Sequence, residues 1–146
     1  MSGKPAIGQA TGATAGLREH ALSRFVDIVG PAHAIADGER QQPFLRELRG
    51  LYEGRAALVL RPGSTDEVSQ ILSVANEARI GIVPQGGNTG LVGGQTPSPD
   101  GRQVVLSLSR LTRVRDIDAA GGTMIVEAGV TLADAQAAAD LSLIHI

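Results

Sequence analysis

Apolar positions along the chain fall into helical stripes and short runs that predict a mixture of helices and strands. Residues 17–29 carry apolar side chains at helical spacing, and Gly30-Pro31 ends that helix. Residues 34–54 are polar and mixed, so we expect an irregular segment that leads into the main domain. Residues 1–16 are small and polar, and we expect a disordered tail there, with organelle targeting as the second interpretation.

A strand–helix–strand unit follows. The apolar run 56–60 ends at a turn and predicts a buried strand. Ser64 and Glu67 then form a capping box, in which each side chain satisfies a free main-chain N–H at a helix start. A second short strand is predicted over 81–84. This order predicts a parallel pair of strands with a right-handed crossover.

Three further strands and a helix are predicted beyond a glycine-rich loop. The strands occupy 104–108, 113–118 and 123–127, and the last two are joined by a hairpin-type turn. Thr131 caps a final helix that runs to about Asp140. No linker divides the chain into two domains.

Composition excludes several function classes. The 146 residues suffice for one domain, and the formal net charge of −2 gives no basic face for nucleic acid. Phe25, Phe44 and Tyr52 are the only aromatic residues, which is too few for a base-stacking surface. Cysteine is absent, and no apolar stretch approaches the roughly 20 residues that span a bilayer. We therefore expect a cytoplasmic protein without a transmembrane segment.

The glycine-rich loop Gln85 to Gly94 carries the candidate chemistry. Glycine occupies five of its ten positions, which lets the backbone turn tightly and approach a ligand. Successive main-chain N–H groups in such a turn can converge on an anion. The loop contains no Lys or Arg, so a phosphate would be held mainly by main-chain N–H groups, with the side chains of Asn88 and Thr89.

Better-known phosphate loops do not match this segment. The nucleotide-binding loop G-x-x-x-x-G-K-[ST] requires a lysine, and no two glycines here have the two-residue spacing of G-x-G-x-x-G. A flexible surface loop is the alternative interpretation. The apolar pair Leu91-Val92 disfavours it, because solvated linkers seldom carry such a pair between glycine pairs.

The residues Pro84 to Gly94 resemble the pyrophosphate loop of the vanillyl-alcohol-oxidase (PCMH-type) FAD-binding domain. Flanking segments agree in order and spacing. Residues 58–68 resemble the strand, turn and helix that begin this domain, and 126–132 resemble its later adenosine-side segment. Residues 49–54 resemble the branch that includes D-2-hydroxyglutarate and D-lactate dehydrogenases. The resemblance covers roughly 42–140.

The resemblance implies an α+β fold, the N-terminal part of such a domain, with a small mixed sheet and flanking helices. It places a truncated FAD-binding domain at 55–140, preceded by the helix and leading segment at 17–54. Gly129 would lie against the adenosine half of FAD, unless it serves only as a turn before Thr131. The implied cofactor-binding residues are Pro84, Gln85, Gly86, Gly87, Asn88, Thr89, Gly90, Leu91, Gly93, Gly94 and Gly129.

Function is implied by the same resemblance. The intact protein would be an FAD-dependent dehydrogenase that oxidises a D-2-hydroxy acid, such as D-2-hydroxyglutarate or D-lactate, and passes electrons to an acceptor. Asn88 stands near the place where relatives with covalent flavin often carry histidine, so we expect non-covalent FAD. Alternatives are an alditol or sugar-lactone oxidase, a non-enzymatic nucleotide-diphosphate-binding module, and a fragment that binds nothing.

No catalytic residue is assigned within this chain. His20, His33 and His145 stand outside the motifs, and the resemblance places the catalytic histidine and a divalent metal in a separate substrate domain. The charged residues between 110 and 118 are interpreted as a solvated strand surface, with a phosphate contact of Arg115 as the alternative. That set comprises Arg110, Arg113, Arg115, Asp116 and Asp118.

The last six residues, Leu141 to Ile146, do not resemble the family. Their sequence LSLIHI equals one reading frame of a common transposase adapter. We expect a non-native, adapter-derived tail, with a natural apolar strand as the alternative. On this interpretation the chain is an N-terminal fragment that is inactive alone.

Overall fold

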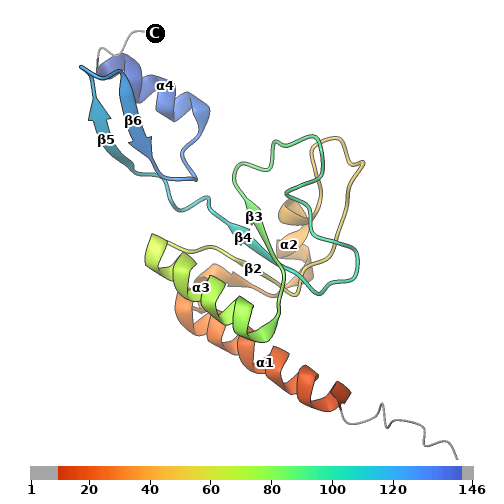
Figure 1. Cartoon of the computed structure of the whole chain (residues 1–146). Coiled ribbons are helices and arrows are strands. Elements are labelled where there is room, and N and C mark those ends of the chain that lie inside the picture. Colours follow the sequence, from red (N-terminus) through yellow and green to blue (C-terminus); the bar gives the residue numbers. More distant parts are fainter. Residues whose placement is uncertain (1–9, 143–146) are drawn as a thin grey trace, which may run out of the picture.

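Two structural units make up the part of the chain that the computed structural model describes, residues 10–142 (Figure 1). The sheet unit contains a four-stranded sheet and three helices, and the hairpin unit contains two strands and one helix. The elements of the sheet unit are α1 (Ala10–Val29), a short 3₁₀ turn (Pro31–His33), β1 (Ala34–Ile35), α2 (Gly38–Leu45), β2 (Leu58–Leu60), α3 (Thr65–Ala78), β3 (Ile82–Gln85) and β4 (Val104–Ser107). Those of the hairpin unit are β5 (Val114–Asp118), β6 (Thr123–Val126) and α4 (Leu132–Leu141).

The four-stranded sheet has the order β1-β2-β4-β3. Strands β2 and β3 both pair with β4 in parallel, and β1 pairs with β2 antiparallel. The predicted strands β2 and β3 are therefore parallel, but the prediction that they pair is wrong because β4 lies between them. Three successive β4 residues, Val104, Val105 and Leu106, are buried, as expected for a central strand covered on both faces. β3, which contains Pro84, forms one edge of this sheet.

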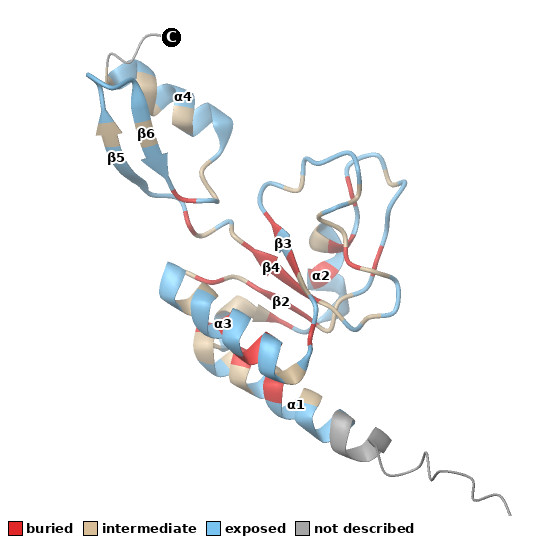
Figure 2. Cartoon of the chain, viewed as in Figure 1, coloured by how far each residue is buried: buried red, intermediate tan, exposed pale blue. Residues whose placement is uncertain are grey.

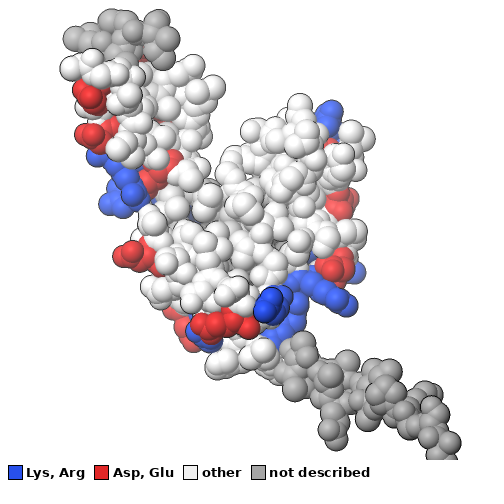
Figure 3. All heavy atoms as spheres, in the orientation of Figure 1, with Lys and Arg blue, Asp and Glu red and all other residues white. Residues whose placement is uncertain are grey.

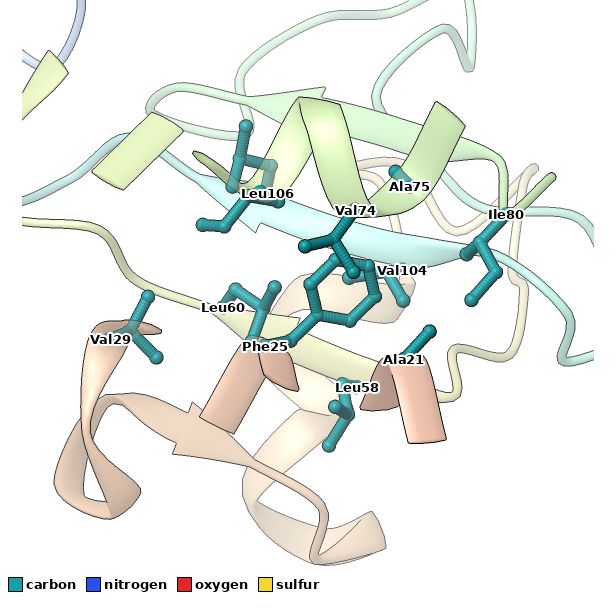
Figure 4. Packing of buried hydrophobic residues seen from close by; sticks show 11 residues of the cluster. Ala21, Phe25, Val29, Leu58, Leu60, Val74, Ala75, Ile80, Val104 and Leu106 are labelled. Carbon is teal, nitrogen blue, oxygen red and sulfur yellow. The ribbon is translucent and has the colours of Figure 1, made fainter. Parts of the chain in front are cut away.

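Helices α1 and α3 cover one face of the sheet, and α2 covers the other (Figure 1). Phe25 of α1 is fully buried and points between the strands and α3 toward Val74 and Val104 (Figure 4). On the opposite face, Val59 and Val105 pack with Phe44 of α2. Alternate strand residues thus face the two helical layers, which is the period of two that a pleated strand imposes.

Helix α1 begins at Ala10, seven residues earlier than predicted. The disordered tail predicted for 1–16 is therefore wrong for 10–16, and the remainder lies outside the described residues. Alanines at positions 10, 13 and 15 favour this extension of the helix, although Gly12 and Gly16 oppose it.

Helix α2 lies where an irregular segment was predicted, so that prediction is wrong for 38–45. Asp37 caps its start by accepting a 2.9 Å hydrogen bond from the N–H of Arg40. Gln41 and Leu45 are buried one turn apart. The apolar stripe is short, since Gln41 takes an inward position by donating to Ile35 O at 2.8 Å.

Helix α3 starts as the capping box predicts. Ser64 Oγ accepts a 3.1 Å hydrogen bond from the N–H of Glu67. Glu67 Oε2 accepts from the N–H of Gly63 at 2.7 Å, one residue before the expected partner. The helix ends at Ala78, and the residue that caps it, Arg79, has a left-handed φ of 55°.

The hairpin unit confirms both predicted strands and the turn between them. Thr131 caps α4 by accepting from the N–H of Asp134 at 3.2 Å. Few residues of the hairpin unit are buried (Figure 2). Several apolar residues of β6 and α4 are exposed, including Ile125, Val126 and Leu132. Residues 143–146, which carry most of the predicted non-native tail, lie outside the described residues.

Candidate cofactor site

The glycine-rich loop leaves β3 at the end where all three parallel strands terminate, the usual ligand edge of an open α/β sheet. Among the residues that the structure describes, no main-chain N–H from Gly86 to Gly94 donates to a protein oxygen. Gly86, Gly87, Thr89 and Gly90 are exposed. A run of main-chain N–H groups without protein acceptors, in residues that are mostly exposed, fits the binding of a diphosphate.

Packing within the chain does not explain all the glycines of this loop. A Cβ on Gly87 would meet only the Thr89 methyl group at 3.9 Å, and one on Gly94 would meet nothing within 4 Å. Gly93 differs, because it has a φ of 77° and a Cβ there would lie 2.8 Å from the Tyr52 ring. Gly90 is closely packed against Gln95. Gly87 and Gly94 therefore leave space that a ligand can use.

The side chain of Asn88 binds the protein itself. Its Nδ2 donates to Pro43 O at 3.1 Å and to Arg46 O at 2.9 Å, both at the end of α2. Its φ of 55° is left-handed, a conformation that asparagine tolerates better than most residues. The side chain therefore fastens the loop to the end of α2, and its Nδ2 is engaged with two protein oxygens. Thr89 remains the exposed polar side chain of the loop.

The other predicted residues of the loop have different environments. Gln85 is buried, and its Nε2 donates to Phe44 O at 2.9 Å and Gln95 O at 3.1 Å. Pro84 is exposed on β3. Leu91 is partly exposed, and its carbonyl oxygen accepts a hydrogen bond from Arg49 Nη2. The sequence gives no signal for this neighbouring cation, because Arg49 lies 42 positions away.

A tight turn in the leading segment presents Arg49 to the loop. The buried carboxylate of Glu47 accepts from the N–H of Arg49 at 2.8 Å and of Leu51 at 2.6 Å. These hydrogen bonds, that of Arg49 foremost, hold the pKa of Glu47 below its ordinary value although burial opposes them. Gly50 completes the turn with a φ of 70°.

Close packing of the main chain requires a glycine at position 129. A Cβ at this position would lie 2.0 Å from Leu108 O and 2.8 Å from Leu111 O, and its N–H donates to Leu111 O at 2.8 Å. The main-chain approach to residues 108–111 therefore explains this glycine without a ligand. The neighbouring Ala128 O lies 3.8 Å from the Cβ position of Gly86, so this segment does sit beside the loop.

Two arginines of β5 and its approach converge on Glu127. Arg113 donates through its N–H at 3.0 Å and its guanidinium at 2.9 Å, and Arg115 Nη2 donates at 3.1 Å. These bonds, chiefly those of Arg113, lower the pKa of Glu127 to about 2. Arg110 donates to Arg61 O at 2.8 Å. Arg113, Arg115, Asp116 and Asp118 are exposed, which confirms the predicted solvated strand surface for these four residues. The prediction missed the buried partner Glu127 of the two arginines and the main-chain partner of half-buried Arg110.

A cleft of about 290 Å³ lies between the two units. Its walls are mainly apolar, with Arg115 and Glu127 as charged members. Figure 3 shows a hollow between the hairpin unit and the loops whose visible sides carry few charged side chains. The lining residues are Thr65, Val68, Leu108, Leu111, Arg115, Val126, Glu127 and Ala128.

The described residues contain no group of three or more potential metal-ligating side chains. His20 and His33 belong to α1 and the turn after it, outside the loop, and His145 lies outside the described range. No helix within 10–142 is long and apolar enough to cross a membrane.

Comparisons with known proteins show which family the chain belongs to. A sequence profile described as "FAD binding domain" matches residues 56–143, more than half of the chain. The chain is 40% identical over 111 residues to a probable mitochondrial D-2-hydroxyglutarate dehydrogenase of Oryza sativa subsp. indica, covering 76% of this chain and 20% of that protein. It is 37% identical over 111 residues to the mitochondrial D-2-hydroxyglutarate dehydrogenase of Arabidopsis thaliana, with the same coverage. The chain thus spans about a fifth of the length of these relatives.

The fold also matches a solved structure. The crystal structure of p-cresol methylhydroxylase with substrate bound superimposes with a TM-score of 0.74 at 20% identity, covering 88% of this chain and 25% of that one. This likeness confirms the predicted α+β, PCMH-type fold. The prediction of a cytoplasmic location is wrong, because these relatives are named as mitochondrial proteins. That prediction relied on the absence of a bilayer-spanning stretch and on the small, polar residues 1–16, which lack the apolar stretch of a secretory signal. Neither feature excludes targeting to an organelle. From the profile match and the fold together, the chain belongs to the FAD binding domain family.

Proposed function

We propose that the loop from Pro84 to Gly94 binds the diphosphate of FAD through its main-chain N–H groups. The observation that carries this proposal is the run Gly86–Gly94, whose N–H groups donate to no protein oxygen among the described residues. Gly87 and Gly94 leave the space that a close ligand needs. Arg49 places its guanidinium beside Leu91 O within the loop, where it also lies 3.8 Å from the carboxylate of Glu47. Gly93 and Gly90 shape the backbone on the exit side.

FAD is held without a covalent bond. Asn88 stands where a covalent attachment to the loop would be expected, and an amide forms no such bond to the flavin. Its Nδ2 is already engaged with two carbonyl oxygens. Acid precipitation tests this point, and we expect the yellow colour to remain in the supernatant. Colour in the washed pellet would contradict non-covalent binding.

The protein acts as a dehydrogenase of D-2-hydroxy acids, with D-2-hydroxyglutarate and D-lactate as the leading candidate substrates. The names of the relatives support the first of these. When bound, FAD supplies the hydride-accepting chemistry, and an electron acceptor reoxidises it. The residues of this chain bind and orient the cofactor. We assign the catalytic residues and a divalent metal to a separate substrate domain, as the resemblance to this family implies.

Two measurements on the purified protein test these proposals separately. Isothermal titration with FAD, monitored also by visible flavin absorbance, tests the cofactor, and failure to bind FAD would overturn the whole proposal. Reduction of an artificial electron acceptor by the full-length protein, which includes the substrate domain, tests the reaction, whereas residues 1–146 alone should give no turnover. We expect turnover with a D-2-hydroxy acid and none with its L-enantiomer. Turnover with alditols or sugar lactones instead would place the protein among the oxidases of those substrates.

A further inference from the structure

The carboxyl end of α2 obtains its hydrogen-bond partners from the glycine-rich loop. The last four carbonyl groups of a helix lack partners within the helix. Here Pro43 O accepts from Asn88 Nδ2 at 3.1 Å, and Phe44 O accepts from Gln85 Nε2 at 2.9 Å. Asn88 Nδ2 also donates to Arg46 O at 2.9 Å, just beyond the helix. Two amide side chains of the loop region therefore cap α2 from a distance of about forty residues in sequence.

The same contacts fix the backbone between the two amide side chains. Gln85 is buried as the last residue of β3, and Asn88 is held in a left-handed conformation. Gly86 and Gly87 lie between these two anchors, with N–H groups that no described protein oxygen accepts. Glycine is otherwise the residue that loses most backbone freedom on ordering. A segment anchored at both ends has already lost part of that freedom before a ligand arrives, which favours binding.

We propose that Asn88 and Gln85 are positioning residues that preform the diphosphate site by capping α2. This inference rests on the proposed binding of FAD to the loop. The capping also has an electrostatic role, because the carboxyl end of a helix carries a partial negative charge that disfavours a nearby anion. Each amide N–H donates directly to these carbonyl oxygens and offsets part of that charge.

Substitutions of Asn88 separate the hydrogen bonds from the backbone conformation. Asn88→Asp keeps the shape of the side chain but removes both donors and places a carboxylate against carbonyl oxygens. Asn88→Gly removes the donors without adding charge, and glycine accepts the φ of 55°. Asn76→Asp, at an exposed position on α3, is the control with the same chemical change.

The readouts are the FAD dissociation constant of the purified protein and amide hydrogen exchange without FAD. We expect both Asn88 variants to bind FAD about tenfold more weakly or worse, the loss of one to two hydrogen bonds, with Asn88→Asp the weaker. Exchange should accelerate at residues 86–91 and stay unchanged in β2 and β4. The Asn76→Asp control should match the wild type in both readouts.

Each outcome decides one question. If the wild type does not bind FAD, the proposed function fails. If the wild type binds FAD but Asn88→Gly binds equally well, with unchanged exchange at 86–91, the positioning role fails and the function stands. A merely structural role would instead lower the unfolding midpoint and accelerate exchange throughout the sheet. Should Asn88→Asp fail to fold, Asn88→Gly together with the isosteric Gln85→Glu decides the matter by the same criteria.

Discussion

Arg115 of β5 donates a 2.7 Å hydrogen bond through Nη2 to the hydroxyl of Thr65 in the first turn of α3, and the same nitrogen lies 3.1 Å from Glu127. This arginine therefore joins the hairpin unit to the sheet unit across the cleft. Thr65→Val removes the acceptor while keeping the shape. We expect the free energy of unfolding to fall by less than about 1 kcal/mol, because both partners contact solvent.

The local effect of Thr65→Val should exceed the global one. Hydrogen exchange should accelerate over residues 114–126 and remain unchanged in β2 and β4. Thr112→Val is the matched control, because Thr112 is exposed and makes no side-chain hydrogen bond to the described residues. Equal exchange in the two variants would show that the Thr65 contact does not hold the units together.

Gly129→Ala should be strongly destabilising. The added methyl group would lie 2.0 Å from Leu108 O, and main-chain atoms on both sides cannot move aside as a flexible side chain would. We expect a loss of about 3 kcal/mol in urea unfolding, the upper range for overpacking. Gly38→Ala, with nothing within 4 Å of its Cβ, should be neutral or slightly stabilising. A loss under about 0.5 kcal/mol for Gly129→Ala would contradict this packing.

Stability should depend on pH through Glu127. Its pKa falls from 4.5 to about 2 in the folded chain, so the folded state favours the charged form. This contribution is fully present above pH 4.5 and is lost as pH falls from 4.5 toward 2. Glu127→Gln should therefore be less stable than the wild type at pH 7, and the difference should shrink steadily below pH 4.5.

Urea unfolding of Glu127→Gln and wild type at several pH values measures this linkage. Other carboxylates with lowered pKa values, such as Glu47 and Asp100, are common to both proteins and cancel in the difference. A difference that stays constant between pH 4.5 and pH 2 would show that Glu127 is not the titrating group.

Ser64→Ala should cost about 1 kcal/mol, because it leaves the N–H of Glu67 without its 3.1 Å acceptor at the start of α3. Ser69→Ala, at an exposed position within the same helix, should be neutral or stabilising by a few tenths of a kcal/mol, since alanine has the higher helix propensity. Equal urea midpoints for the two variants would contradict the capping role.

Local signals predicted much of the fold. The capping residues Ser64 and Thr131 locate the starts of α3 and α4, because capping depends on atoms three residues apart. The apolar runs locate β2 and β4, because burial of a short strand on both faces is visible in consecutive apolar residues. Helix α2 was missed although Asp37 offers a capping signal, because polar residues and Pro43 obscure its apolar stripe. The pairing of the strands could not be predicted from the sequence either, since β4 inserts between β2 and β3, which both precede it in the chain.

In the candidate site, too, features encoded by neighbouring residues could be predicted, whereas contacts between distant residues could not. The high content of glycine identified the loop, because a backbone that approaches a ligand closely requires residues without a side chain. The partners of Asn88 lie more than forty positions earlier, and Arg49 is equally distant from Leu91. At Gly129 the sequence suggested a ligand contact that the packing of the chain does not require. Main-chain packing against Leu108 explains this glycine.

Pro84 has a further consequence through its place on the edge strand β3. The carbonyl oxygens of Gly81 and Gln85 accept hydrogen bonds from Val104 of β4 at 2.9 Å and from Leu108, just after β4, at 2.8 Å. Since main-chain groups alternate in direction along a strand, the nitrogen of Pro84 faces the free edge, where it has no hydrogen to donate. A second chain that added a strand here would lose a ladder bond beside the cofactor loop. This edge therefore resists intermolecular strand addition, a common first step of aggregation.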